Sequence, residues 1–467
     1  MLVSNSFGHR FCFPTSRGEY GEGFENEAST HVEAWLSYVG IMYSAFYVGD
    51  KVRPDDPSLV GNPMTDVADW QTRFIPMVVH GDGVSFTNNG NKLLVTSLSF
   101  LLVPGWSVAN TFMTAVFAGF NRVYEAIHGS DTWGVIWEYL LSGFTSAFDG
   151  FHAPLDPFGR PWPAGSFAAE MAGKPMCGGR ERGVIWLGSM DAEYAANELK
   201  YPHYNCCGQV CGLCPVRQSN FRDFRKNATF KSNLYQPGPN DSKISSHAFW
   251  RIPGVSRFTY RGDEMHGLAL GPLSWLHASA MWSLLSTEFG IFGPGSVEAR
   301  VSRLWSLIQE AYDACVVEKR LTNLSIGMVG KSNHLPALGC KAMEGRALIK
   351  PMLHIFQNLA RNDVLLGSHD GHVIACYTCL LQFYEIIDGY GILLPANAAA
   401  HLLKVTEDFL LHYNWLNWWA QQRGETMYKT TTKHHTFWHI AYLAQFMSPR
   451  AGWTYAFEDF VGKVKRR

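Results

Sequence analysis

The sequence contains little charge. Asp, Glu, Lys and Arg make up 17% of its 467 residues and nearly cancel, giving a formal net charge of −1 and a pI near 7.0. This balance excludes a general electrostatic attraction to nucleic acid, so any contact with DNA has to come from a local basic patch. Residues 93–121 carry no charge at all. Because Pro104, Gly105 and Asn110 interrupt this run, we expect two buried strands and a buried helix rather than a membrane span.

Other features are also missing. We find no repeat of fixed period and no low-complexity tract, and the first residues, MLVSNSFGHRFCF, have neither a long apolar run nor a small-residue cleavage site. Secretion is therefore not expected. The ten cysteines then fit a reducing compartment, where thiols stay free or bind metal. With 47% hydrophobic residues the chain has ample apolar surface to bury, and its length suggests two or three domains or one core with a large insertion. We expect an intracellular protein without a membrane partner.

The pattern of apolar residues predicts an α/β protein. Residues 1–70 form a peripheral segment with one helix, VEAWLSYVGIMYSAF. FIPMVVHGDGVSF and KLLVTSLSFLLV, separated by the turn-forming TNNGN, predict an antiparallel hairpin, and GVIWLGSMD predicts a third strand. Between them, TFMTAVFAGFNRVYEAI predicts an apolar helix. Residues 71–266 would be the core, 267–430 a helical insertion with apolar residues at three- and four-residue steps, and 431–467 helices that return to the core.

Two aspartates end predicted strands. Asp82 follows an apolar strand and precedes Gly83, and His80 would share its face because side chains alternate along a strand. Asp191 ends GVIWLGSM and precedes a predicted helix. A turn role for Asp82 and an N-cap role for Asp191 are the structural alternatives. If the two acids lie within a few ångströms, they can hold Mg²⁺ ions, which prefer oxygen ligands.

A cysteine-rich stretch predicts a zinc site. Cys211 and Cys214 form a Cys-x-x-Cys in a polar, turn-rich segment, and zinc needs four ligands. In the DEMH element, Asp263 and His266 lie one helical turn apart and could complete the set, unless Asp263 only caps a helix. Other candidate ligands are His203, Cys206 and Cys207. A disulfide or free thiols remain alternatives, whereas the apolar surroundings of Cys376 and Cys379 indicate core positions.

One basic patch could contact nucleic acid. It interleaves cations with the rings of Phe221, Phe224 and Phe230, a composition that can neutralise phosphates and stack bases. The cations of this patch are Arg217, Arg222, Arg225, Lys226 and Lys231. A second patch ends the chain at residues 463–467. A solvated surface is the alternative for both.

Taken in order, these residues resemble a DDE-type transposase, similar to those of CACTA-type elements and of the Plavaka-like and hAT-like groups. The resemblance rests on an Asp in HGDG, a second strand-borne Asp, a Cys-x-x-Cys, an Asp-x-x-His and a final acid in an aromatic FE motif. That acid is Glu458, with Asp459 as a rival. The stretch KHHTFWHIAYL resembles the histidine-containing helix that such enzymes place before the last acid.

The resemblance implies a ribonuclease-H-like mixed sheet interrupted by a large all-α insertion. Asp82, Asp191 and Glu458 would be catalytic acids that bind Mg²⁺ or Mn²⁺, and the substrate would be DNA, cut and rejoined in the nucleus, with self-association left open. One alternative is a fragment or decayed copy that serves as an inert nucleic-acid or protein binding module. Another is a carbohydrate-active enzyme with Glu385 and Asp388 as paired carboxylates.

Overall fold

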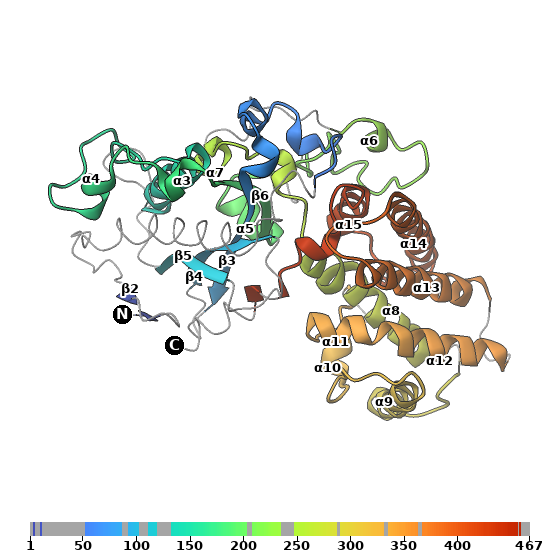
Figure 1. The fold of residues 1–467 in the computed structure, drawn as a ribbon. Coiled ribbons are helices and arrows are strands. Elements are labelled where there is room, and N and C mark those ends of the chain that lie inside the picture. The colour runs from blue at the N-terminus through green and yellow to red at the C-terminus, as the bar shows by residue number, and fades with distance from the viewer. Residues whose placement is uncertain are drawn as a thin grey trace. The chain divides into compact units, whose positions relative to one another are not determined.

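The computed structural model divides into two compact units, each assembled from segments that are distant in sequence. Unit 1 comprises residues 1–203, 235–261 and 454–467, and unit 2 comprises residues 204–234 and 262–453 (Figure 1). The helix expected at 32–46 lies outside the described residues. The structure describes residues 3–4, 10–11, 52–85, 92–101, 111–118, 132–202, 208–234, 247–286, 290–330, 335–362, 367–455 and 457–458.

Unit 1 is built on a four-stranded mixed sheet of order β5-β4-β3-β6. Its strands are β3 (Phe74–Ser85), β4 (Lys92–Phe100), β5 (Thr111–Ala118) and β6 (Arg182–Met190). β3 pairs antiparallel with β4 and parallel with β6. The predicted α/β class, hairpin and third strand are confirmed. The apolar interiors of β4 and β6 are buried almost throughout, as expected for strands covered on both faces.

The helix expected over TFMTAVFAGFNRVYEAI is wrong in its first half, because residues 111–118 form β5. This strand pairs antiparallel with β4, and Thr114 Oγ1 donates to the Thr96 carbonyl at 2.9 Å. A short apolar run without clear periodicity fits a buried helix and a buried strand equally well, and pairing with β4 decides between them. Residues 119–131 lie outside the described part of the chain.

Helices and short turns complete unit 1. Trp137 lies at the centre of its core, with its ring edge-on to Trp133 at 6.5 Å and to Phe249 at 5.5 Å between centroids. Such edge-to-face pairs stabilise a core beyond the area they bury. The remaining elements are β1 (Val3–Ser4), β2 (Arg10–Phe11), α3 (Thr132–Asp149), α4 (Phe167–Met171), α5 (Ala192–Asn197), α7 (Ala248–Arg251) and five 3₁₀ turns at Pro57–Leu59, Pro63–Asp66, Trp70–Thr72, Met176–Gly179 and Arg257–Thr259.

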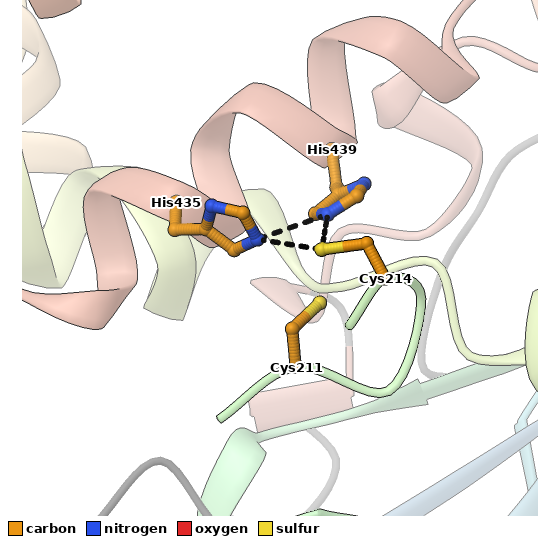
Figure 2. Close-up of side chains that lie close together, drawn as sticks. All are labelled: Cys211, Cys214, His435 and His439. Carbon is orange, nitrogen blue, oxygen red and sulfur yellow. Dashed lines mark hydrogen bonds between the residues drawn. The ribbon is translucent and has the colours of Figure 1, made fainter. Parts of the chain in front are cut away.

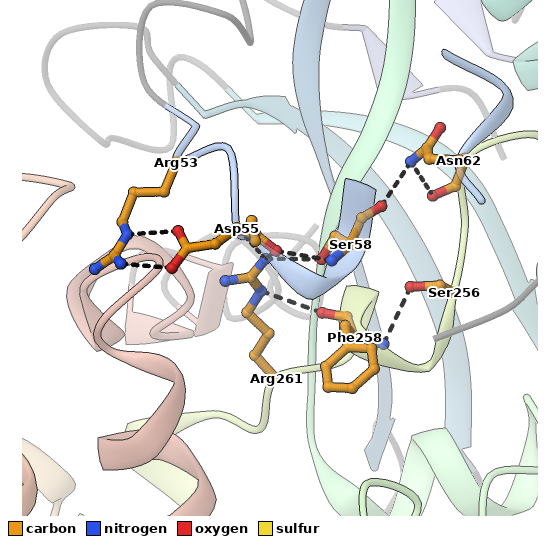
Figure 3. Close-up of polar contacts among 9 residues, drawn as sticks. Arg53, Asp55, Ser58, Asn62, Ser256, Phe258 and Arg261 are labelled. Atoms are coloured by element: carbon orange, nitrogen blue, oxygen red, sulfur yellow. Dashed lines mark hydrogen bonds and ion pairs between the residues drawn. The ribbon is translucent and has the colours of Figure 1, made fainter. Parts of the chain in front are cut away.

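A buried ion pair ties two of these turns together (Figure 3). Arg261 Nη2 donates to the carboxylate oxygens of Asp56 at 3.0 and 3.1 Å and to Ser58 Oγ at 2.9 Å, while its Nε donates to the Phe258 carbonyl at 3.1 Å. Asn62 Nδ2 adds bonds to the carbonyls of Ser58 and Gly254. Removing one member of such a buried pair leaves an uncompensated charge, which costs about 3–5 kcal/mol.

Unit 2 is helical and has its own core, in which Tyr377, Tyr413 and Leu416 are fully buried. The helices expected from periodicity are confirmed at α9 (Val297–Ala314), α12 (Ile349–Arg361), α13 (Ser368–Gly389) and α14 (Ala396–Gln422). The helix expected from the resemblance at KHHTFWHIAYL is present as α15 (Thr432–Leu443). No helix of the described residues is long and apolar enough to cross a membrane. The elements of unit 2 are α6 (Thr229–Ser232), the irregular helix η8 (Met265–Leu273), α8 (Ser274–Leu285), α9 (Val297–Ala314), α10 (Ile326–Val329), α11 (Ala342–Ala347), α12 (Ile349–Arg361), α13 (Ser368–Gly389), α14 (Ala396–Gln422), α15 (Thr432–Leu443) and η9 (Pro449–Ala451).

Candidate functional site

The sheet brings Asp82 and Asp191 to neighbouring positions in unit 1. In the parallel pairing of β3 with β6, the last matched pair is Gly81 with Met190, and the two aspartates are the next residue along each strand. Hydrogen-bonded strands lie about 4.8 Å apart. Both side chains are partly exposed. Asp82 lies within β3, three residues before its end, and Asp191 directly follows β6, so the two residues are neighbours where β6 ends and both remain accessible to a ligand.

Asp191 also caps a helix. Its Oδ1 accepts a hydrogen bond of 2.6 Å from the backbone N–H of Tyr194, and its own backbone is extended, as is typical of an N-cap. The N-cap interpretation is thus confirmed. The cap holds the carboxylate in one orientation at the end of β6.

Tyr194 packs directly on the glycine that precedes Asp82. A Cβ placed on Gly81 would lie 2.1 Å from Tyr194 Cε1, so only glycine fits under this ring. The hydroxyl group is 3.0 Å from Thr96 Oγ1. Burial raises the pKa of Tyr194, and the nearby charge of Asp82 raises it further, against the effect of the bond to Thr96. The phenol therefore stays protonated beside the Asp82 carboxylate.

The C-terminal segment reaches the opposite face of β3 from this ring. His80, which shares a face with Asp82, stacks on Phe457 with ring centroids 4.5 Å apart and planes inclined by 1°. Its Nδ1 lies 3.4 Å from Ser97 Oγ. Because Glu458 is the next residue after Phe457, the stack brings this acid to the strand that carries Asp82. Asp459 lies outside the described residues.

The tightest group of possible metal ligands lies in unit 2. Within the described residues, the one set of three or more Cys, His or acid ligand atoms lying within 4.8 Å of one another is Cys211, Cys214, His435 and His439 (Figure 2). Asp82, Asp191 and Glu458 do not form a set this compact. The two cysteines come from a loop and the two histidines from successive turns of α15, where residues four apart share a face.

The distances in this set suit a tetrahedral metal ion. Cys214 Sγ lies 3.2 Å from His435 Nε2 and 3.4 Å from His439 Nε2, and the two Nε2 atoms are 3.1 Å apart. Zinc bonds of 2.0–2.3 Å to N and S give a tetrahedron with edges of about 3.3–3.8 Å, so the three separations match these edges after side-chain shifts of a few tenths of an ångström. The Leu213 backbone N–H also donates to Cys211 Sγ at 3.3 Å. The cluster could therefore hold a metal such as zinc.

The protonation states favour metal binding. Burial raises the pKa of the Cys211 thiol, but its hydrogen bond with Cys214 and the charge of His439 outweigh burial and hold that pKa well below its usual range. The pKa of Cys214 is raised, chiefly by the same hydrogen bond. Burial lowers the pKa of His435, which keeps this ring neutral. The Cys211 thiolate and the neutral His435 ring are thus in the forms that bind metal, whereas Cys214 would release its proton as an ion binds.

The ligands differ from the set expected with the cysteines. Asp263 accepts hydrogen bonds from the backbone N–H groups of Met265 and His266 and lies 2.5 Å from His266 Nδ1, so this acid caps the start of η8. His203, Cys206 and Cys207 lie outside the described residues. The signal for the histidines was the His-x-x-x-His spacing in KHHTFWHIAYL.

The basic residues of the predicted patch differ in exposure and in ion pairing. Arg217, Arg222 and Lys226 are exposed, and Arg225 is exposed but paired with Asp223 at 2.8 Å. Lys231 is mostly buried and pairs with Glu407 at 2.7 Å.

The rings expected to stack on bases, those of Phe221, Phe224 and Phe230, are buried in the core of unit 2 and cannot do so. The C-terminal patch at 463–467 lies outside the described residues. Of the pair expected in a carbohydrate-active enzyme, Glu385 is exposed on α13 and Asp388 accepts a bond from Arg346.

A comparison with protein-family models finds no match for this chain. A search among curated proteins finds no significant match either.

Proposed function

We propose that the protein is a transposase-derived, metal-dependent DNA nuclease or strand transferase of the DDE type. The observation that carries this proposal is the register between β3 and β6, which makes Asp82, within β3, a neighbour of Asp191, the first residue after β6. The stack of Phe457 on His80 adds a third acid, Glu458, from the far end of the chain.

The fold supports the same proposal. An antiparallel set of three strands is followed by a fourth strand parallel to the first, and a separate helical unit interrupts the chain before its last residues rejoin unit 1. A ribonuclease-H-like core with a helical insertion has this order of elements, which supports our proposal of that fold for unit 1.

In this proposal the three acids together coordinate Mg²⁺ or Mn²⁺. Bound ions would activate the attacking oxygen and stabilise the leaving oxygen during an in-line displacement at phosphorus. The Asp191 cap uses Oδ1, which leaves Oδ2 as the oxygen for an ion. Because the ions of a two-metal site are about 3.5–4 Å apart, its carboxylates span more than one coordination sphere and need not form one compact set.

The cluster of Cys211, Cys214, His435 and His439 is proposed as a structural zinc site. Four protein ligands close the coordination sphere, whereas catalytic zinc keeps an open position. The ring of Phe230 covers the site, with centroids 4.6 Å from His435 and 6.2 Å from His439. The ion would fasten the loop of the two cysteines to α15.

An inert DNA-binding descendant is the second candidate. The observation that favours it is that Asp82, Asp191 and Glu458 do not gather into one compact set, while the zinc cluster does. With DNA as the ligand, we propose a nuclear location for either candidate.

Cleavage of supercoiled plasmid DNA distinguishes the candidates. We expect the full chain to nick DNA with Mg²⁺ or Mn²⁺, and Asp82→Asn to abolish nicking. Asp313→Asn changes an exposed carboxylate on α9 that pairs with Arg320, and it should leave the rate unchanged. Absence of nicking by the unmodified protein over a range of ion concentrations would favour the inert candidate, and nicking by Asp82→Asn at the normal rate would refute the site.

A further inference from the structure

In unit 2, the segment that follows the cysteine pair lies along one face of α14. Lys231 Nζ donates to Glu407 at 2.7 Å, and Asn414 Nδ2 donates to the backbone carbonyl of Arg222 at 2.8 Å. Helix residues spaced three or four apart share a face, so the face marked by Glu407 and Asn414 also carries Leu411 and Trp418.

This face exposes large apolar side chains beside the segment. Trp418 is 53% exposed and Leu411 is 45% exposed. Trp418 lies one helical turn beyond Asn414, the residue that contacts Arg222. Its ring is supported by Trp415, with centroids 6.0 Å apart. The exposed Trp418 indole therefore contacts a second ring of the same helix and does not lie on a loop.

The charges of this segment and of α14 are unbalanced. Their acids are already paired, Asp223 with Arg225, Glu407 with Lys231 and Asp408 with Lys404. Within the described residues, Arg217, Arg222 and Lys226 are exposed and form no ion pair. The Arg222 guanidinium lies 5.0 Å from the buried Phe221 ring, which supports it from below. The surface thus presents three free cations to an anionic partner.

We propose that Arg217, Arg222, Lys226 and Trp418 form a binding surface for single-stranded DNA. Cations that follow a phosphate backbone beside an aromatic ring that stacks on a base are the two components of single-strand recognition. That the nucleic acid is DNA rests on the proposed function. Free DNA ends next to a cleavage site would supply such a strand.

The metal cluster gives this surface its rigidity. Cys214 precedes Arg217 by only three residues, so a zinc ion on Cys211 and Cys214 fixes the start of the basic segment. The Lys231 bond to Glu407 fixes its other end. With both ends held, the cations keep their places beside α14, and loss of the ion should weaken DNA binding without any change in the surface residues.

Fluorescence anisotropy with a labelled oligothymidylate tests the surface on the full, zinc-loaded chain. The Asp82→Asn variant in the absence of Mg²⁺ keeps the oligonucleotide intact. We expect Trp418→Ala to weaken binding by about tenfold or more and Trp418→Phe to retain most of it. The matched control, Phe158→Ala, removes another exposed ring, 49% exposed in unit 1, and should have no effect.

The salt dependence tests the cations separately. For a single strand, each phosphate contact contributes about 0.7 to the slope of log K against log salt concentration. The Arg222→Ala and Lys226→Ala double variant should lower this slope by about 1.4, whereas Lys319→Ala, an exposed lysine after α9, should not change it. Removal of zinc with a chelator should weaken binding about as much as the double variant.

Several results would refute the proposed DNA-binding surface. These are unchanged affinity in Trp418→Ala, an unchanged salt slope in the double variant, or equal affinity for an RNA oligomer, which would refute the assignment to DNA. The outcome is separable from that of the nuclease proposal. Binding that depends on Trp418 in a protein that never cleaves supports the surface alone, and cleavage by a protein whose binding ignores Trp418 supports the nuclease alone.

Discussion

A single added methyl group tests the packing behind the acid pair. Gly81 and Gly83 flank Asp82 on the same strand, and only Gly81 lies under the ring of Tyr194. A Cβ on Gly81 would lie 2.1, 2.5 and 2.7 Å from three ring carbons, whereas a Cβ on Gly83 would meet its nearest atoms, in Lys92 and Leu94, at 3.6 and 3.7 Å. Gly81→Ala and Gly83→Ala are therefore the same chemical change in two different surroundings.

The difference in free energy follows from these distances. Overpacking a buried site costs about 1–3 kcal/mol or more, and Tyr194 cannot move away freely because it is buried and bonded to Thr96. Gly83→Ala makes ordinary contacts and gains about 0.5–1 kcal/mol by restricting the unfolded chain. Because both changes restrict the unfolded chain to the same extent, we expect the two variants to differ by the overpacking cost, about 1–3 kcal/mol or more in the stability of the sheet.

Native-state hydrogen exchange of peptides from residues 74–85 measures this difference. It reports the opening of β3 without a contribution from the unfolding of unit 2. In the double variant with Tyr194→Ala, the cost of Gly81→Ala should largely disappear, because the two sites are in contact and their effects are not additive. Equal protection in the two glycine variants, or a cost that persists without the ring, would refute the packing described for Tyr194.

Three further predictions concern named side chains. Asp191→Asn should preserve the N-cap and change the stability of the sheet by no more than about 0.5 kcal/mol, whereas Asp191→Ala should lower that stability by about 1 kcal/mol. Both variants should lose metal-dependent cleavage. Cleavage by the Asp191→Asn variant would contradict a role in metal binding. His80→Phe should keep the stack on Phe457 and most of the rate of plasmid nicking, whereas His80→Ala should lower this rate about a hundredfold. Equal losses of rate in the two variants would instead indicate that the imidazole takes part in the chemistry. Burial raises the pKa of Glu264 to about 7, from the usual 4.5 of a glutamate. The folded protein therefore holds a proton that the unfolded chain releases, and this stabilisation, complete below the unfolded pKa, is lost as the pH rises through about 7. Urea unfolding of Glu264→Gln between about pH 5 and pH 8 should show a smaller loss of stability with pH than the unmodified protein, and an identical pH dependence would refute this assignment.

The elements with strong periodicity could be predicted from the sequence. The alternation and turn residues around TNNGN gave the hairpin of β3 and β4, and the three- and four-residue steps gave α9 and α14. Asp191 could be predicted both as a strand-end acid and as an N-cap, and the structure shows the cap. β5 could not be predicted, because eight apolar residues carry too little periodicity to separate a strand from a helix.

The ligands of the metal cluster could be predicted from the sequence only in part. Cys214 and His439 are 225 residues apart, and a Cys-x-x-Cys contains no information about which distant helix completes the site. Asp263 and His266 were nearer candidates, but an Asp three residues before a His at a helix start also caps that helix, and here it does so. Local hydrogen bonding decided the role of Asp263, and tertiary packing of α15 decided the ligands.

The most direct test of the central claim is a crystal structure of the protein soaked with Mn²⁺, with anomalous scattering used to locate the ions. We expect an anomalous peak within about 2.5 Å of carboxylate oxygens of both Asp82 and Asp191, with Glu458 in the same site. Bound manganese elsewhere, with the carboxylates of Asp82 and Asp191 turned away from each other and free of metal, would contradict it.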